Sequence, residues 1–125
     1  MDFSLSEERK MLQETVGRFF ENNYKDIKKR GEYLKMTDGF SREFWKESSN
    51  LGVINGLVSP AFGGLGGSGE DICIIFELIG KSLCIEPFLS SGLLSSTILS
   101  SLNNPKTDLI TVSYTHLTLP TIYSV

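Results

Sequence analysis

Apolar side chains near the start of the chain recur with the spacing of an amphipathic helix. The recurring positions are Leu12, Val16, Phe19, Phe20 and Ile27. Ser4 stands three positions before Glu7, the spacing of a capping box, and Ser6 is an alternative cap. We therefore predict a helix over residues 5–24. The basic run 25–30 either continues this helix or kinks away from it, and we interpret it as a solvated face.

A second helix is predicted over residues 42–51, after a connector at 31–40. Ser41 can cap this helix, and Gly52 suits the position after its last turn. The helix presents the apolar residues Phe44, Trp45 and Leu51. The connector mixes Gly, Asp and Thr with a few apolar residues. We expect at most one helical turn in it.

Residues 70–82 predict a third helix that is apolar in almost every direction, which is typical of a buried helix. Its polar exceptions, Glu77 and Lys81, stand four positions apart on one face. Glu77 could be a catalytic carboxylate buried near a ligand. The pattern favours the other interpretation, an ion pair with Lys81 at the edge of the solvent.

Pro87 precedes a fourth predicted helix, residues 88–102, which ends before Asn103-Asn104-Pro105. This helix is rich in small residues: Ser90, Ser91, Gly92, Ser95, Ser96, Thr97, Ser100 and Ser101. Small side chains let another helix or a ligand pack closely. The hydrophobic pattern thus predicts an all-α fold, with no strand before residue 111.

The glycine-rich stretch 60–69 suggests a phosphate-cradling loop. However, no Lys-Ser or Lys-Thr pair follows it, and no β-α-β unit surrounds it. We predict instead an irregular loop, Gly63 to Ser68, in which backbone approaches backbone closely.

Composition excludes several classes of protein. The net charge of −3 disfavours a broad nucleic-acid surface, no apolar run is long enough to span a membrane, and Met1-Asp2-Phe3-Ser4 does not resemble a secretion signal. Cys73 and Cys84 are too far apart on one continuous helix to form a disulfide, so we expect two buried free thiols in a reducing cytoplasm. Without a histidine before residue 111, we expect no metal site and no nucleophile–base pair of the usual kind.

The last 15 residues, 111–125, differ from the rest because they carry no charged side chain and contain the single histidine, His116. The run Thr111 to Thr121 back-translates to a DNA string that resembles the end of a transposase-based sequencing adapter. We therefore expect a natural domain over residues 1–110 and a non-native tail over 111–125. The other interpretation is a real, strand-like C-terminus, since β-branched residues favour strands. On the adapter interpretation, His116 is not a catalytic candidate.

Three stretches in order resemble acyl-CoA dehydrogenases, and together they cover about residues 1–102. They are the opening MDFSLSEER, the run from Trp45-Lys46-Glu47 through Leu51-Gly52-Val53 to Pro60-Ala61-Phe62-Gly63-Gly64-Leu65-Gly66-Gly67, and Phe76-Glu77-Leu78-Ile79-Gly80-Lys81-Ser82-Leu83. The segment Pro87–Ser90 and the long connector are most similar to the bacterial pimeloyl-CoA dehydrogenase small-subunit branch. Ser49, Ile54 and Phe62 depart from the residues that are commoner in the family.

The resemblance implies that the chain is the truncated N-terminal domain of this fold, an orthogonal helical bundle. In the family, FAD lies between a central β-domain and C-terminal helices, and the catalytic base comes from the C-terminal domain. The base removes the α-proton while FAD accepts the β-hydride, which leaves a trans-2-enoyl-CoA. The resemblance therefore assigns no catalytic, FAD-binding or metal residue to residues 1–110. It implies that this domain forms one wall of the acyl-chain cavity, with Pro87, Ser90, Ser91 and Leu94 as candidate acyl contacts. Helix packing would equally explain each of the four.

The leading hypothesis is therefore a fragment of a cytoplasmic, FAD-dependent acyl-CoA dehydrogenase, inactive by itself. Its full-length partners would be an acyl-CoA substrate, an electron-transfer acceptor and further subunits in a homo- or hetero-oligomer. Alternatives within the superfamily are an acyl-CoA oxidase and a flavin monooxygenase. Alternatives of another kind are a non-catalytic partner subunit of a heteromeric dehydrogenase and a free-standing helical interaction module.

Overall fold

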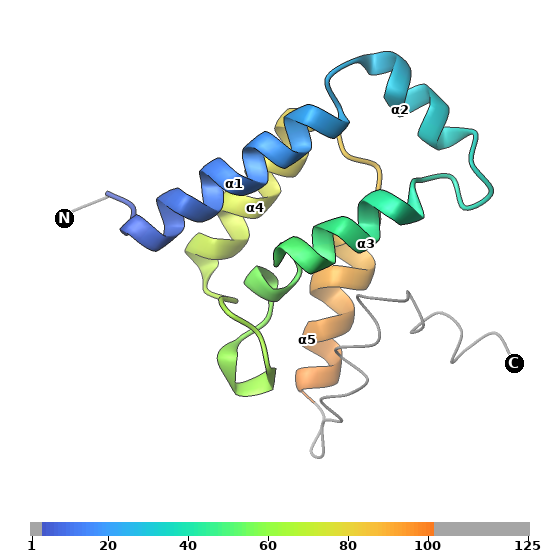
Figure 1. The fold of residues 1–125 in the computed structure, drawn as a ribbon. Coiled ribbons are helices and arrows are strands. Elements are labelled where there is room, and N and C mark those ends of the chain that lie inside the picture. The colour runs from blue at the N-terminus through green and yellow to red at the C-terminus, as the bar shows by residue number, and fades with distance from the viewer. Residues whose placement is uncertain (1–3, 102–125) are drawn as a thin grey trace, which may run out of the picture.

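The computed structural model describes residues 4–101, which form helices joined by short turns (Figure 1). The α-helices are α1 Glu7–Asn23, α2 Ile27–Leu34, α3 Arg42–Leu51, α4 Gly69–Ser82 and α5 Ser95–Ser100. Short 3-10 turns lie at Asn55–Leu57 and Pro60–Phe62, and a π-helix spans Phe88–Leu94. No strand occurs among the described residues, which confirms the predicted all-α class.

Side-chain caps begin the helices where the sequence allows them. The Ser6 hydroxyl accepts a hydrogen bond from the Arg9 amide at 3.3 Å, so Ser6 rather than Ser4 is the N-cap of α1. The Ser41 hydroxyl accepts from the Phe44 amide at 3.1 Å and begins α3, which ends at Gly52 with a φ of 97°. The predicted bounds of this helix, 42–51, are confirmed.

The connector predicted at residues 31–40 contains one helical turn, residues 31–34, which is the end of α2. The basic run kinks away from α1 as a separate helix, which was one of the two alternatives. Asp26 is its N-cap, and its carboxylate accepts a hydrogen bond from the Lys28 amide at 3.1 Å. Tyr33 holds the helix to α1 through an edge contact between its ring and that of Tyr24, at a centroid distance of 5.3 Å.

The core lies where α1, α3 and α4 meet the start of the last helical segment. α1 and α4 lie side by side and run in the same direction, and α5 crosses them steeply (Figure 1). Fully buried aromatic rings join three of these elements, with Phe20 and Phe88 at 5.8 Å and Trp45 and Phe88 at 5.2 Å. The apolar residues of the core are Val16, Phe20, Phe44, Trp45, Val53, Ile54, Leu57, Val58, Ile74, Ile75, Leu78, Phe88 and Leu99.

The glycine-rich loop is irregular over Gly63–Ser68, as predicted, and its backbone lies against other backbone. A Cβ atom at Gly64 would stand 1.9 Å from the Val58 carbonyl oxygen, and one at Gly66 would stand 2.5 Å from the Gly56 carbonyl oxygen. The loop therefore requires glycine because there is no space for a side chain.

Two further predictions about side chains are corrected. The Cys73 thiol is free but exposed rather than buried, because it faces outward from α4, and Cys84 is half-buried. Glu77 and Lys81 are both exposed and form no ion pair with each other. Within residues 4–101 no helix is long and apolar enough to cross a membrane. The expected domain boundary at residue 110, the tail and His116 lie outside the described residues.

Candidate functional site

The segment that carries the candidate acyl contacts begins at a buried carboxylate. Glu86 is only 6% exposed, and its Oε1 accepts a hydrogen bond of 2.7 Å from the Tyr24 hydroxyl. The Ile85 amide donates to the same hydroxyl at 3.4 Å. These bonds tie the turn before Pro87 to the C-terminal end of α1.

Burial disturbs the titration of this cluster. It raises the pKa of Glu86 above its ordinary value, although the hydrogen bond from Tyr24 and bonds from backbone amides lower it in part. Burial, with the nearby Glu86 carboxylate, also raises the pKa of the Tyr24 hydroxyl and of the Cys84 thiol. A thiol that resists ionisation is a poor nucleophile, which disfavours Cys84 as a reactive residue.

Beyond Pro87 the backbone forms a π-helix, which differs from the single helix predicted over 88–102. The Ser95 amide donates to the Ser90 carbonyl, five residues earlier, and the Ser95 hydroxyl donates to that same carbonyl at 2.7 Å. α5 then continues to Ser100. The wider turn changes which side chains share a face, because the repeat in a π-helix is longer than in an α-helix.

The structure divides the four candidate acyl contacts between two faces of this segment. Ser90 and Leu94 are exposed, whereas Ser91 is buried and Pro87 is half-buried. Ser91 lies beside Gly92, whose Cα faces the Leu57 and Ile54 side chains, so helix packing explains the small residues on this face. Only Ser90 and Leu94 are therefore available to a molecule outside the core.

Three large apolar side chains, which we call the exposed stripe, stand on the outer face of this segment. They are Leu89, Leu94 and Ile98, with exposures of 55%, 49% and 61%. Leu89 and Ile98 were missed among the sequence candidates. Leu89 stands five positions before Leu94, and Ile98 stands four positions after it. The three side chains share a face only if a π-helical turn precedes the α-helical turns. The single α-helix predicted over residues 88–102 would place Leu89 and Leu94 on different faces.

A shallow cavity of about 150 Å³ lies between α5 and the loop that follows α3. Leu57, Phe62 and Ile72 line one side of it, and Leu93 and Thr97 line the other. The cavity is small and largely apolar, so it suits part of an alkyl chain rather than a charged group.

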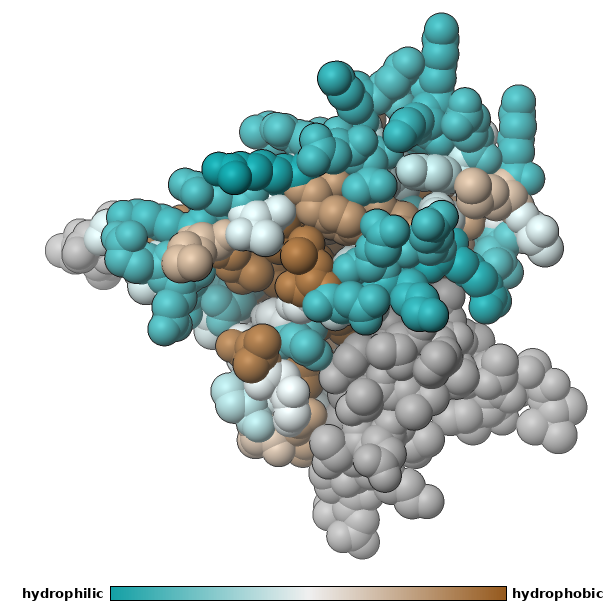
Figure 2. Space-filling view, in the orientation of Figure 1, coloured by the Kyte–Doolittle hydropathy of each residue, from teal (hydrophilic) through white to brown (hydrophobic). Residues whose placement is uncertain are grey.

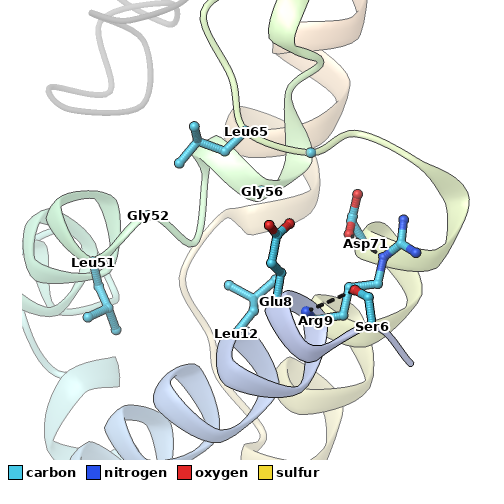
Figure 3. Close-up of a pocket in the computed structure, with 10 residues that line it drawn as sticks. Ser6, Glu8, Arg9, Leu12, Leu51, Gly52, Gly56, Leu65 and Asp71 are labelled. Carbon is cyan, nitrogen blue, oxygen red and sulfur yellow. Dashed lines mark hydrogen bonds and ion pairs between the residues drawn. The ribbon is translucent and has the colours of Figure 1, made fainter. Parts of the chain in front are cut away.

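A larger pocket, of about 540 Å³, lies between α1, the end of α3 and the glycine-rich loop (Figure 3). Leu12, Leu51 and Leu65 line its apolar part. Arg9 also lines this pocket, but its charge is already paired with two carboxylates. Its Nε donates to the Asp71 carboxylate at 3.0 Å, and the guanidinium also pairs with Glu70. The Arg9 and Ser68 hydrogen bonds lower the pKa of Asp71, although its burial acts in the other direction. Arg9 thus braces α1 against α4 instead of presenting a free charge to a ligand.

The glycine-rich loop does not fit a cofactor phosphate. Its amides donate within the chain: Gly64 to Ser59, Leu65 to Asn55, Gly66 to Val58 and Gly67 to Gly56, at 2.8–3.1 Å. A phosphate-binding loop needs free amides that converge on the ligand. Among the described residues, no group of three or more His, Cys, Asp and Glu side chains could hold a metal ion either.

Comparison with known proteins agrees with this helical architecture. The family model described as acyl-CoA dehydrogenase, N-terminal domain, matches residues 6–103. The chain is 29% identical to the acyl-CoA dehydrogenase IpdE2 of Mycolicibacterium smegmatis, an alignment that covers 77% of this chain and 31% of that protein. It is 34% identical to the mitochondrial isovaleryl-CoA dehydrogenase of Bos taurus and 32% identical to that of Pongo abelii, each covering 70% of this chain and 24% of the relative.

No solved structure matches the chain significantly. The chain spans only about a quarter to a third of the length of these relatives. The match to the family model nevertheless extends from the cap of α1 to the end of α5 and includes every described helix. The chain therefore belongs to the acyl-CoA dehydrogenase family, of which it represents the N-terminal domain.

Proposed function

We propose that this chain is part of a flavin-dependent acyl-CoA dehydrogenase, in which the exposed stripe forms one wall of the acyl-chain pocket. The observation that carries the proposal is the outward row of Leu89, Leu94 and Ile98 on a segment whose other face is buried in the core. Exposed apolar side chains in a contiguous row are typical of a surface that another domain or a ligand covers.

The small hydroxyl side chains beside the stripe support a pocket wall. Ser90 and Thr97 are exposed next to Leu89 and Ile98, and neither has a bulky side chain that would fill the space outside. An alkyl chain could lie along this face without displacing buried residues. Of the original four candidates, Ser90 and Leu94 remain our proposed contacts, whereas Pro87 and Ser91 would support the wall from behind.

The reacting groups of the proposed enzyme would come from outside this chain. Parts of such an enzyme outside this chain would hold FAD, which would supply a hydride acceptor for the β-carbon. The described residues contribute shape and exclusion of water, which strengthens electrostatic interactions at a reacting centre. An electron-transfer acceptor, further subunits and a cytoplasmic location belong to the same proposal, as does a non-native tail over residues 111–125.

The first test is genetic. We expect independently prepared DNA of the source organism to continue the reading frame past the codon for Ile110, into a β-rich segment and further helices. A natural stop codon near Val125 would contradict the fragment hypothesis.

The second test uses the longer protein. Leu94→Phe should narrow the pocket and lower kcat/KM for long acyl-CoAs more than for short ones, because the added ring occupies the far part of an alkyl site. Met11→Phe on α1 is the control, since Met11 is 68% exposed and is not part of the stripe. Equal effects of Leu94→Phe on all chain lengths would argue against a wall at this position.

A further inference from the structure

Helix α2 contributes no buried residue to the domain and projects from its corner (Figure 1). Few described contacts hold it: the Tyr33 ring rests against Tyr24, the Tyr33 hydroxyl donates to the Asn23 carbonyl at 3.3 Å, and Arg30 Nε donates to the Leu83 carbonyl at 3.2 Å. These contacts all lie on one side of the helix. The opposite side faces the solvent without covering anything.

The exposed side of this helix is cationic in a chain whose net charge is negative. Residues 25–36 contain five cationic side chains, Lys25, Lys28, Lys29, Arg30 and Lys35, against Asp26 and Glu32. The ion pairs formed within residues 4–101 include none of these five cations. Figure 2 shows hydrophilic side chains gathered over this corner of the molecule. Arg30 is half-buried and donates to the Leu83 carbonyl, whereas the four lysines of this segment are exposed, so their charge is available to a partner.

Large apolar side chains stand among these cations. Ile27, Leu34 and Met36 are 74%, 51% and 45% exposed. Ile27 and Leu34 are seven positions apart and share one face of the helix, and Lys28 and Lys35 form a parallel row one position further on. We call these residues, with Lys29 and Met36, the α2 patch. An apolar row beside a lysine row is the pattern of a helix that lies in a lipid interface.

We propose that the α2 patch is a docking surface for an anionic lipid bilayer. The lysines complement negatively charged headgroups, and their alkyl stems can extend beside Ile27 and Leu34 while those side chains enter the apolar boundary. The helix that carries the patch lies at the corner of the fold opposite the end of α5 (Figure 1). A bilayer presents anionic headgroups beside an apolar boundary, and these match the lysine row and the apolar row of the patch.

The experiment is cosedimentation of the purified chain with vesicles of phosphatidylcholine, either pure or mixed with phosphatidylglycerol. We expect binding to the anionic vesicles, little binding to the neutral ones, and release at high salt, because salt screens the headgroup charge. The double variant Lys28→Glu with Lys29→Glu should weaken binding by more than about tenfold. The double variant Ile27→Ser with Leu34→Ser should weaken it without changing the net charge.

The charge-matched control is Lys10→Glu with Lys46→Glu, which alters exposed lysines of α1 and α3 and should leave binding unchanged. Circular dichroism verifies that each variant is folded. Equal binding to neutral vesicles, or equal losses in the α2 and control variants, would overturn the proposal. So would binding to soluble polyglutamate without binding to vesicles, which would indicate an acidic protein partner. Because none of these readouts requires enzyme activity, the proposal stands or fails independently of the proposed function.

Discussion

Glycines 64, 66 and 67 are required because of what lies beside each Cα. The space that a Cβ would need at Gly64 is taken by the Val58 carbonyl, and Gly67 combines a φ of 84° with a Ser59 amide 2.7 Å from the Cβ position. Gly69, three positions later, has nothing within 4 Å and an ordinary φ. The same residue type is thus essential at one position and replaceable at another.

Gly64→Ala should lower the free energy of unfolding by about 1–3 kcal/mol, the usual range for forcing an atom into filled space. Gly69→Ala is the matched control and should be neutral or stabilising by less than about 1 kcal/mol, since alanine favours a helix. Urea unfolding of the two variants measures both values. Similar losses at both positions would show that the close approach of Gly64 to Val58 is not tight in solution.

The Glu86 carboxylate makes stability depend on pH with a defined sign. Burial raises its folded pKa, whereas the unfolded chain keeps a value near 4.5. As the pH rises from below 4.5, Glu86 ionises first in the unfolded state, so the folded state loses relative stability until its own pKa is passed. Glu86→Gln should remove this decline. The measurement is the difference in unfolding free energy between the two proteins as a function of pH.

The difference between the two proteins isolates the contribution of Glu86. Asp71, whose pKa is lowered, contributes a pH dependence of opposite sign, but it does so in both proteins and therefore cancels. Tyr24→Phe is the companion variant. It removes the hydroxyl that donates to Glu86, and it should destabilise the chain most above the folded pKa of Glu86, where the carboxylate is charged. A difference curve without slope from pH 4.5 upward would show that Glu86 is not desolvated.

At the scale of elements, capping residues decide where helices begin. The Ser41 hydroxyl accepts from the Phe44 amide and is buried at the start of α3, so no water can replace it. Ser59, before the 3-10 turn Pro60–Phe62, makes no side-chain cap bond. Two serines in similar sequence positions therefore differ in their effect on stability.

Ser41→Ala should cost about 1 kcal/mol of stability, the typical value for a lost N-cap. Ser59→Ala should change stability by less than about 0.5 kcal/mol. Thermal unfolding followed by circular dichroism compares them. A larger loss for Ser59→Ala than for Ser41→Ala would contradict the assignment of the cap.

The elements also show where local patterns suffice. Residues 42–51 form a helix with the predicted bounds, because Ser41 and Gly52 terminate it from within the local sequence. The helix predicted over 70–82 begins at Gly69 for the same reason, since Ser68 and Asp71 form a capping box. α2 was underestimated because its residues bury nothing, so their pattern carries no core-facing row. The π-helix was missed because Phe88, at its start, packs on Phe20 and Trp45, and the local pattern does not contain these contacts.

At the scale of the whole molecule, the proposed function has consequences for the isolated chain. We expect the purified chain to retain no FAD and to oxidise no acyl-CoA, because in the proposed function the flavin site and the catalytic base lie outside this chain. The test is dialysis with excess FAD, followed by a visible spectrum and dye-linked assays. A stoichiometric flavin peak would contradict this expectation.

The exposed stripe should promote self-association of the isolated chain. Replacing Leu94 and Ile98 by serine should shift the sedimentation coefficient toward that of a monomer. The exposure of both side chains means that the substitutions remove no core contact. If the serine variant associates as strongly as the parent chain, the stripe is not the contact surface.

The sequence by itself determined the helical class, the caps of α3 and the irregular glycine-rich loop, because periodicity, capping and turn propensity act over a few residues. The three matching stretches also indicated the family before any contact was known. Only the tertiary structure decided which members of the segment 87–98 face outward, because that depends on the π-turn and on the anchoring of Glu86 by Tyr24, 62 positions away in sequence. It likewise decided that Arg9 is occupied by Asp71 and Glu70, and that Cys73 is exposed. A local pattern determines whether a helix face is apolar or polar, whereas residues distant in the chain determine what packs against that face.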